Sequence, residues 1–213
     1  MAEPLTKPAS ILYRLAGSLR AVEETEMNPF SRAIEVLRKL AEAMQTPIAI
    51  VGGLAGIYHR ALVTTLDIDI VVPQERLDDV VDEAAKLGLV IKKHSPAGWH
   101  VLEFEDPEGA VTIEVIPAGQ KSPRDPDHAP PIPSPQELGV NEGLGYASFA
   151  GWVRMKLVAG RDKDRYHLIE ALQHASQQNV ATVVEDLRGF PSEYLQEFQR
   201  LVQASEDENQ ESW

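Results

Sequence analysis

Apolar residues recur at spacings of three and four between residues 31 and 45, which predicts an amphipathic helix with Ser31 as its cap. Pro47 ends that pattern, and the apolar run 48–51 that follows is too short for a helix. We therefore predict a buried strand at 48–51. The pair Gly52-Gly53 after it predicts a sharp turn into a second helix over residues 54–62.

The next segment predicts a second strand, a helix and three more strands. Residues 66–72 form a strand that stops at Pro73, and residues 74–87 are again amphipathic, with Gly88 as the helix C-cap. β-Type runs follow at 89–93, 99–105 and 110–116, and the last two are joined by the hairpin turn Asp106-Pro107-Glu108-Gly109.

The rest of the chain divides at a proline-rich segment. Residues 117–135 contain seven prolines and no hydrophobic period, which indicates a connecting loop between two regions. The predicted C-terminal helices cover 149–160, 164–174, 180–187 and 192–204, and a further helix is predicted over 9–22. The fold class is therefore predicted to be α+β, with a small mixed β-sheet flanked by helices and followed by a C-terminal helical bundle. The predicted divisions are an N-terminal helical extension (1–30), a core (31–135), a C-terminal helical region (136–204) and a disordered acidic tail (205–213).

Composition limits the kinds of ligand and metal site that the chain can form. The chain has 213 residues, a net charge of −13 and no cysteine. The negative charge argues against a broad basic face for long nucleic acid, although a small nucleotide or a nucleic-acid end remains compatible. Without thiolates, any metal must be held by oxygen or imidazole. Neither a membrane helix nor a signal peptide is readable, so we predict a cytoplasmic protein that does not bind membranes.

Acidic residues interrupt two otherwise apolar strands. Asp67 and Asp69 stand two residues apart, so a strand directs both to one face, where they repel each other unless a cation lies between them. Glu114 stands in the run Val-Thr-Ile-Glu-Val-Ile, and it meets the aspartates across neighbouring strands if its apolar neighbours face the core. Hard divalent ions such as Mg²⁺ prefer such oxygen ligands. A solvated sheet face is the simpler alternative.

The turn at Gly52 and Gly53 offers backbone amides where no Cβ intrudes, an arrangement that can cradle phosphate, although a tight turn alone would look the same. The turn lies 14 residues before Asp67, which allows one helix to return the chain to an adjacent strand. Turn and carboxylates would then meet at one end of the sheet.

In this order, the motifs resemble the nucleotidyltransferases of the DNA polymerase beta superfamily, within the group that contains the abortive-infection type E toxins. The similar segments are IAIVGGLAGIYHRALVTTLDIDIVV, VTIEVI and MKLVAGRDKDRYHLIEAL, and together they span about residues 46–175. The resemblance identifies the predicted core as a nucleotidyltransferase core.

The resemblance implies a role for each motif. Asp67, Asp69 and Glu114 would be catalytic and would bind Mg²⁺ (or Mn²⁺), with Glu114 assisting deprotonation of the acceptor hydroxyl. The remaining motif positions would bind a nucleoside triphosphate (NTP), and they are Gly52, Gly53, Thr65, Lys156, Arg161 and Asp164. The implied reaction moves a nucleoside monophosphate from the NTP to a hydroxyl of an RNA end, a protein or a small molecule. A cognate toxin or antitoxin partner is also implied.

Two departures and two alternatives accompany this interpretation. The superfamily often has Ser where this chain has Gly53, and many relatives have Arg where it has Val63, a cation that Arg60 could replace. One alternative is a catalytically inactive nucleotidyltransferase-like binding or antitoxin module. The other is a glycosyltransferase that holds Mn²⁺ on its Asp-x-Asp, which calls for a larger α/β domain before the motif.

Overall fold

The computed structural model describes residues 28–211 apart from 62–64, 96, 122–126 and 128. Most of the predicted N-terminal extension, including the helix over 9–22, therefore lies outside the described residues, as does Val63. Among the described helices, none combines the length and the apolar character needed to cross a bilayer.

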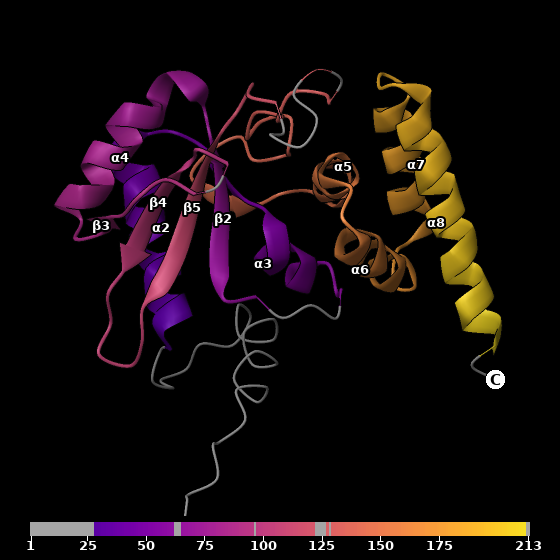
Figure 1. Ribbon diagram of the computed structural model, residues 1–213, viewed down its shortest axis with the longest axis horizontal. Helices are drawn as coiled ribbons and strands as arrows, with labels where there is room; N and C mark the ends of the chain where they lie inside the picture. Colours follow the sequence, from indigo (N-terminus) through magenta and orange to yellow (C-terminus); the bar gives the residue numbers. More distant parts are fainter. Residues whose placement is uncertain (1–27, 62–64, 96, 122–126, 128, 212–213) are drawn as a thin grey trace, which may run out of the picture.

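A six-stranded mixed sheet forms the centre of the fold, with the strand order β3-β4-β5-β2-β1-β6 (Figure 1). The two central strands, β2 and β5, are parallel, and β1 pairs in parallel with β6, while the remaining neighbours are antiparallel. The strand bounds are Ile48–Ile50 (β1), Asp67–Val72 (β2), Val90–Ile91 (β3), His100–Phe104 (β4), Val111–Pro117 (β5) and Leu144–Tyr146 (β6). Strands and helices in these proportions confirm the predicted α+β class.

Helices cover both faces of the sheet (Figure 1). Their bounds are Pro29–Met44 (α2), Gly52–Tyr58 (α3), Leu77–Lys86 (α4, after a 3₁₀ turn at Gln74–Arg76), Phe149–Ala159 (α5), Asp162–Leu172 (α6), Gln177–Leu187 (α7) and Ser192–Glu211 (α8). The cap of α2 is Asn28 and not Ser31, because the Asn28 side chain accepts a hydrogen bond from the backbone N–H of Ser31 at 3.0 Å.

The strands bury two different apolar layers because alternate residues point to opposite faces. Ile68, Ile70 and Ile113 point into a layer closed by α2 and α4. Val71 and Ile116 point into the other layer, which is closed by α5 and the helices after it. Asp67 and Asp69 have the parity of Val71, so they belong to the face that α5 partly covers.

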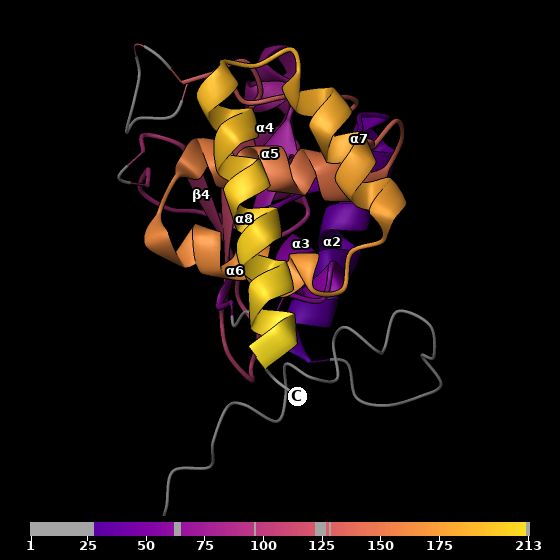
Figure 2. The ribbon, with the colours of Figure 1, turned by 90° about the vertical axis from the view of Figure 1, so that its right-hand side faces the viewer.

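Two features differ from the sequence predictions. Strand β6 lies in the region predicted to be wholly helical, where it forms the edge of the sheet beside β1. Helix α8 continues to Glu211, so the tail from residue 205 that we predicted to be disordered is helical up to that residue (Figure 2). Ser205 is buried against the helices, and Gln203 donates to Asp207 one turn further on at 2.9 Å, which stabilises this acidic end.

Candidate active site

The acidic residues of β2 and β5 lie side by side. The parallel register pairs Asp67 with Thr112 and Asp69 with Glu114. Because paired residues of neighbouring strands point to the same face, the carboxyl groups of Asp69 and Glu114 are direct neighbours, and Asp67 follows two residues along β2. Asp67 is exposed, whereas Asp69 and Glu114 are half-buried, so the group opens to solvent at its Asp67 end.

The pKa of Asp69 is shifted by the charged groups that surround it. Burial, together with the negative charges of Asp67 and Glu114, raises the pKa of its carboxyl to about 7, while Lys156 and Arg161 act in the opposite direction. The same five side chains that the sequence motifs singled out are therefore close enough to influence one another. Their acids are not fully neutralised by their bases, and such a site favours a bound cation.

The glycine turn lies directly against Asp69. Gly52 has φ +63°, and a Cβ added there would stand 1.7 Å from Oδ2 of Asp69. Both the left-handed backbone and the close approach therefore require glycine at this position. The backbone of the turn and the carboxylate of Asp69 are therefore in direct contact.

Gly53 makes room for Thr65. A Cβ at residue 53 would stand 2.6 Å from Oγ1 of Thr65, a buried residue whose hydroxyl donates to Oδ1 of Asp67 at 2.6 Å. Glycine is therefore required at 53, since a side chain there would displace the threonine. In the structure Thr65 orients an acid of the site.

Two cations are fixed by one buried acid at the start of α6. Asp164 is fully buried; its Oδ1 accepts from Lys156 Nζ at 2.8 Å, and its Oδ2 accepts from Arg161 Nε at 2.5 Å. Burial by itself would raise the pKa of Asp164, but the hydrogen bonds from Arg161 and Lys156 outweigh it and lower the pKa. Asp164 thus holds both cations beside Asp69.

Trp152 joins the glycine turn to the basic side of the site, a role that no sequence motif indicates. Its indole Nε1 donates to the carbonyl oxygen of Gly52 at 3.0 Å, and Lys156 Nζ lies 5.9 Å from the centroid of its ring. The spacing of four residues on a predicted helix, with Lys156 in a motif, was the available signal.

The neighbouring histidine and arginine do not complete the site. His59 Nε2 lies 2.8 Å from the carbonyl oxygen of Ala147, and burial lowers the pKa of its ring. Its ring packs beside Trp152 in the core. Arg60 is exposed and has φ +68°. No contact places Arg60 with the acids.

Divalent ions fit these residues when a nucleotide supplies part of their ligands. Within the described ranges, no three His, Cys, Asp or Glu side chains form a group that could hold a metal ion by themselves. Mg²⁺ is commonly bound by one or two carboxylates together with phosphate oxygens of a substrate. The Gly52 turn, which lies against Asp69 without a side chain of its own, suits that mode, because phosphate oxygens bound by the turn would meet the carboxylate oxygens.

Comparisons with known proteins give remote similarities in structure only. No protein-family model matches the sequence, and no curated protein matches it. One similar structure is ANT(2'')-Ia in complex with adenylyl-2''-tobramycin, at 14% identity and a TM-score of 0.42, covering 84% of this chain and 97% of the other. JHP933 from Helicobacter pylori is 15% identical with a TM-score of 0.42, covering 89% and 96%. The Thermotoga maritima CCA-adding enzyme is 14% identical with a TM-score of 0.35, covering 92% and 54%.

Proposed function

We propose that this chain is a nucleotidyltransferase of the DNA polymerase beta superfamily that uses divalent metal and an NTP. The observation that carries the proposal is the register of Asp69 with Glu114, with the Cβ-free turn at Gly52 against Asp69. Three acids, a glycine turn and two anchored cations are the parts that phosphoryl transfer requires, since its catalysis consists mainly of positioning and charge stabilisation.

In the proposed reaction, each group has one role. The turn at Gly52 and Gly53 holds the triphosphate, and Lys156 and Arg161 balance the charge of its β- and γ-phosphates. Asp67, Asp69 and Glu114 hold the metal ions, which when bound polarise the α-phosphate and stabilise the leaving pyrophosphate. Thr65 orients Asp67, and Asp164 orients the two cations. Glu114 accepts the proton of the acceptor hydroxyl.

The proposal extends to the biological setting only through the sequence resemblance. We propose a place near the abortive-infection type E toxins, with a cognate antitoxin or toxin as partner. An inactive binding module is disfavoured because it has no need for three converging acids beside anchored cations. A dinucleotide-type parallel sheet around Asp-x-Asp would favour the glycosyltransferase alternative, and the sheet here is mixed.

The test is transfer of label from α-³²P-labelled ATP, CTP, GTP and UTP to components of a bacterial cell extract, with pyrophosphate release measured in parallel. We expect Mg²⁺-dependent labelling with at least one nucleotide, and its loss in Asp67→Asn and Asp69→Asn. Asp162→Asn is a matched control, because Asp162 is exposed and its ion pair with Arg165 lies at the surface. Labelling that persists without Asp67 and Asp69 would exclude these residues as the catalytic acids.

A further inference from the structure

The sheet arranges the parts of the site in a line. Across the order β1-β2-β5-β4, the chain places the Gly52 turn after β1, Asp67 and Asp69 on β2, and Glu114 on β5. On β4, Val101 stands opposite Glu114. Trp99 has the parity of Val101 and packs into the same apolar layer as Ile116, so it belongs to the same face one step beyond Glu114.

The geometry of in-line transfer indicates from which side of the sheet the acceptor hydroxyl approaches. The attacking oxygen and the leaving pyrophosphate stand on opposite sides of the α-phosphorus. The proposed pyrophosphate contacts gather on the β1 side, because Trp152 ties the Gly52 turn to the region of Lys156. The attacking hydroxyl therefore approaches from the β5 and β4 side, past Glu114, where Trp99 stands.

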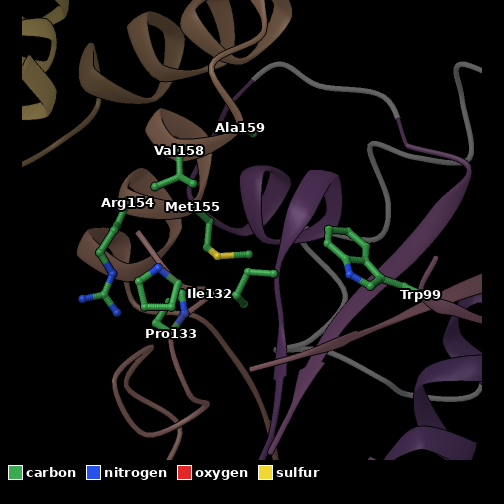
Figure 3. Close-up of a pocket in the computed structure, with 8 residues that line it drawn as sticks. Trp99, Ile132, Pro133, Arg154, Met155, Val158 and Ala159 are labelled. Carbon is green, nitrogen blue, oxygen red and sulfur yellow. The ribbon is translucent and has the colours of Figure 1, made fainter. Parts of the chain in front are cut away.

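A pocket lies on that side between Trp99 and helix α5 (Figure 3). One wall is Trp99, and the opposite wall is the flank of α5 next to Lys156. Its lining residues are Trp99, Pro131, Ile132, Pro133, Arg154, Met155, Val158 and Ala159. All of them except Arg154 are apolar, and Arg154 is itself 6% exposed and paired with Asp186 at 3.3 Å.

Gln120 connects two residues that line the pocket, Trp99 and Ile132. Its side-chain oxygen accepts from Trp99 Nε1 at 3.2 Å, and its backbone oxygen accepts from the N–H of Ile132 at 2.7 Å. The N–H of Gly119 donates to the Ile132 oxygen at 2.7 Å, which closes a short ladder. The pocket is therefore formed by the residue before β4, by α5 and by the segment after β5.

We propose that this pocket, lined by Trp99, Ile132, Met155 and Val158, binds the acceptor, and that the acceptor is a low-molecular-mass alcohol or phenol with an apolar or aromatic body. This inference rests on the proposed function. The acceptor oxygen bonds to the α-phosphorus, the bond from that phosphorus to the bridging oxygen of the β-phosphate breaks, pyrophosphate leaves and the hydroxyl proton passes to Glu114. A polyanionic acceptor is disfavoured, because Arg154 is the one cation among the residues that line the pocket, it is paired with Asp186, and the chain carries a net charge of −13.

The test separates the acceptor from the nucleotide. α-³²P-labelled NTP and Mg²⁺ are incubated with the low-molecular-mass filtrate of a bacterial extract and, separately, with its RNA and protein fractions. Val158→Trp fills the pocket, and Val202→Trp introduces the same bulk on α8 outside it. Mg²⁺-dependent NTP affinity is measured by calorimetry for each variant, which reports the donor site independently.

We expect label on apolar compounds of the filtrate, reduced at least about tenfold in Val158→Trp and retained in Val202→Trp, with NTP affinity unchanged in both. Label found on RNA or protein, no label in any fraction despite NTP binding, or full transfer by Val158→Trp would each overturn the acceptor assignment while the nucleotide site stands. Absence of Mg²⁺-dependent NTP binding in the wild type would instead remove the proposed function, and the acceptor assignment with it.

Discussion

The indole Nε1 of Trp152 donates a hydrogen bond to the carbonyl oxygen of Gly52 at 3.0 Å, across 100 residues of sequence. This bond ties the turn after the first strand to the helix that carries Lys156. A buried aromatic ring with one polar atom is suited to this task, because it fills the core and fixes the backbone at the same time. The Gly52 turn and Lys156 are thereby held at a fixed separation.

Trp152→Phe keeps most of the ring and removes the donor. We expect the variant to fold and to bind Mg²⁺·NTP about three to ten times more weakly, because it lacks one hydrogen bond to the carbonyl oxygen of Gly52. Calorimetric titration with the NTP measures the change. Trp99→Phe is the matched control, because the indole N–H of Trp99 donates to Gln120 on the acceptor side. The NTP affinity of this variant should equal that of the wild type.

Local patterns sufficed to predict the parts of the site that lie within single strands and helices. The parity of Asp67 and Asp69 follows from the apolar residues between and after them, and the strand of Glu114 from its apolar neighbours. The sequence could not show that β2 and β5 pair in the register that sets Asp69 beside Glu114, because register arises from contacts 45 residues apart, from 69 to 114.

Features that depend on tertiary contacts were missed. Strand β6 is only the triplet Leu-Gly-Tyr, which has no strand pattern of its own and is ordered by pairing with β1. The acidic end of α8 has a composition typical of disorder, yet a buried Ser205 anchors it. The contact between Gly53 and Thr65, which excludes a side chain at 53, depends on residues 12 positions apart and has no local sequence pattern.

Gly52→Ala tests the close approach of the turn to Asp69. Gly143 offers a matched control, because it has φ +59° with nothing within 4 Å of an added Cβ, whereas Gly52 has φ +63° and the clash with Asp69. Gly143→Ala should cost about 1 kcal/mol of unfolding free energy from backbone strain alone. Gly52→Ala should cost more and abolish NTP binding. Denaturant unfolding and calorimetry measure the two effects, and equal losses in both variants would contradict the contact.

The raised pKa of Asp69 predicts how the stability of the fold changes with pH. Its pKa of about 7 lies above the ordinary value of 3.8, so ionisation of Asp69 opposes folding, and the stability of the metal-free protein should fall as the pH rises between these values. Asp69→Asn removes this loss. In chelator, the variant should melt several degrees above the wild type at about pH 8 and close to it at about pH 4. Thermal unfolding by fluorescence measures this, and a variant less stable than the wild type at the higher pH would refute the assignment.

Asp164→Asn should damage stability and activity together. The substitution leaves Lys156, which is 4% exposed, without its anionic partner, at a cost of about 3–5 kcal/mol. Asp162→Asn removes an exposed pair and should cost less than about 1 kcal/mol. Because the pKa of Asp164 is lowered, its stabilising effect is complete at neutral pH and is lost as the pH falls through that lowered pKa. Urea unfolding of both variants at neutral pH and in acid checks the difference.

The most direct test of the central claim is calorimetric titration of the protein with ATP, CTP, GTP and UTP, each with and without Mg²⁺. Asp67→Asn and Glu114→Gln are compared with Glu103→Gln, which alters an acid on the same face that is paired with Lys92 at 2.7 Å. We predict that at least one NTP binds about tenfold or more tightly with Mg²⁺, that both site variants lose this gain and that Glu103→Gln retains it. Binding of no NTP, or binding indifferent to Mg²⁺ and to both site variants, would contradict the account.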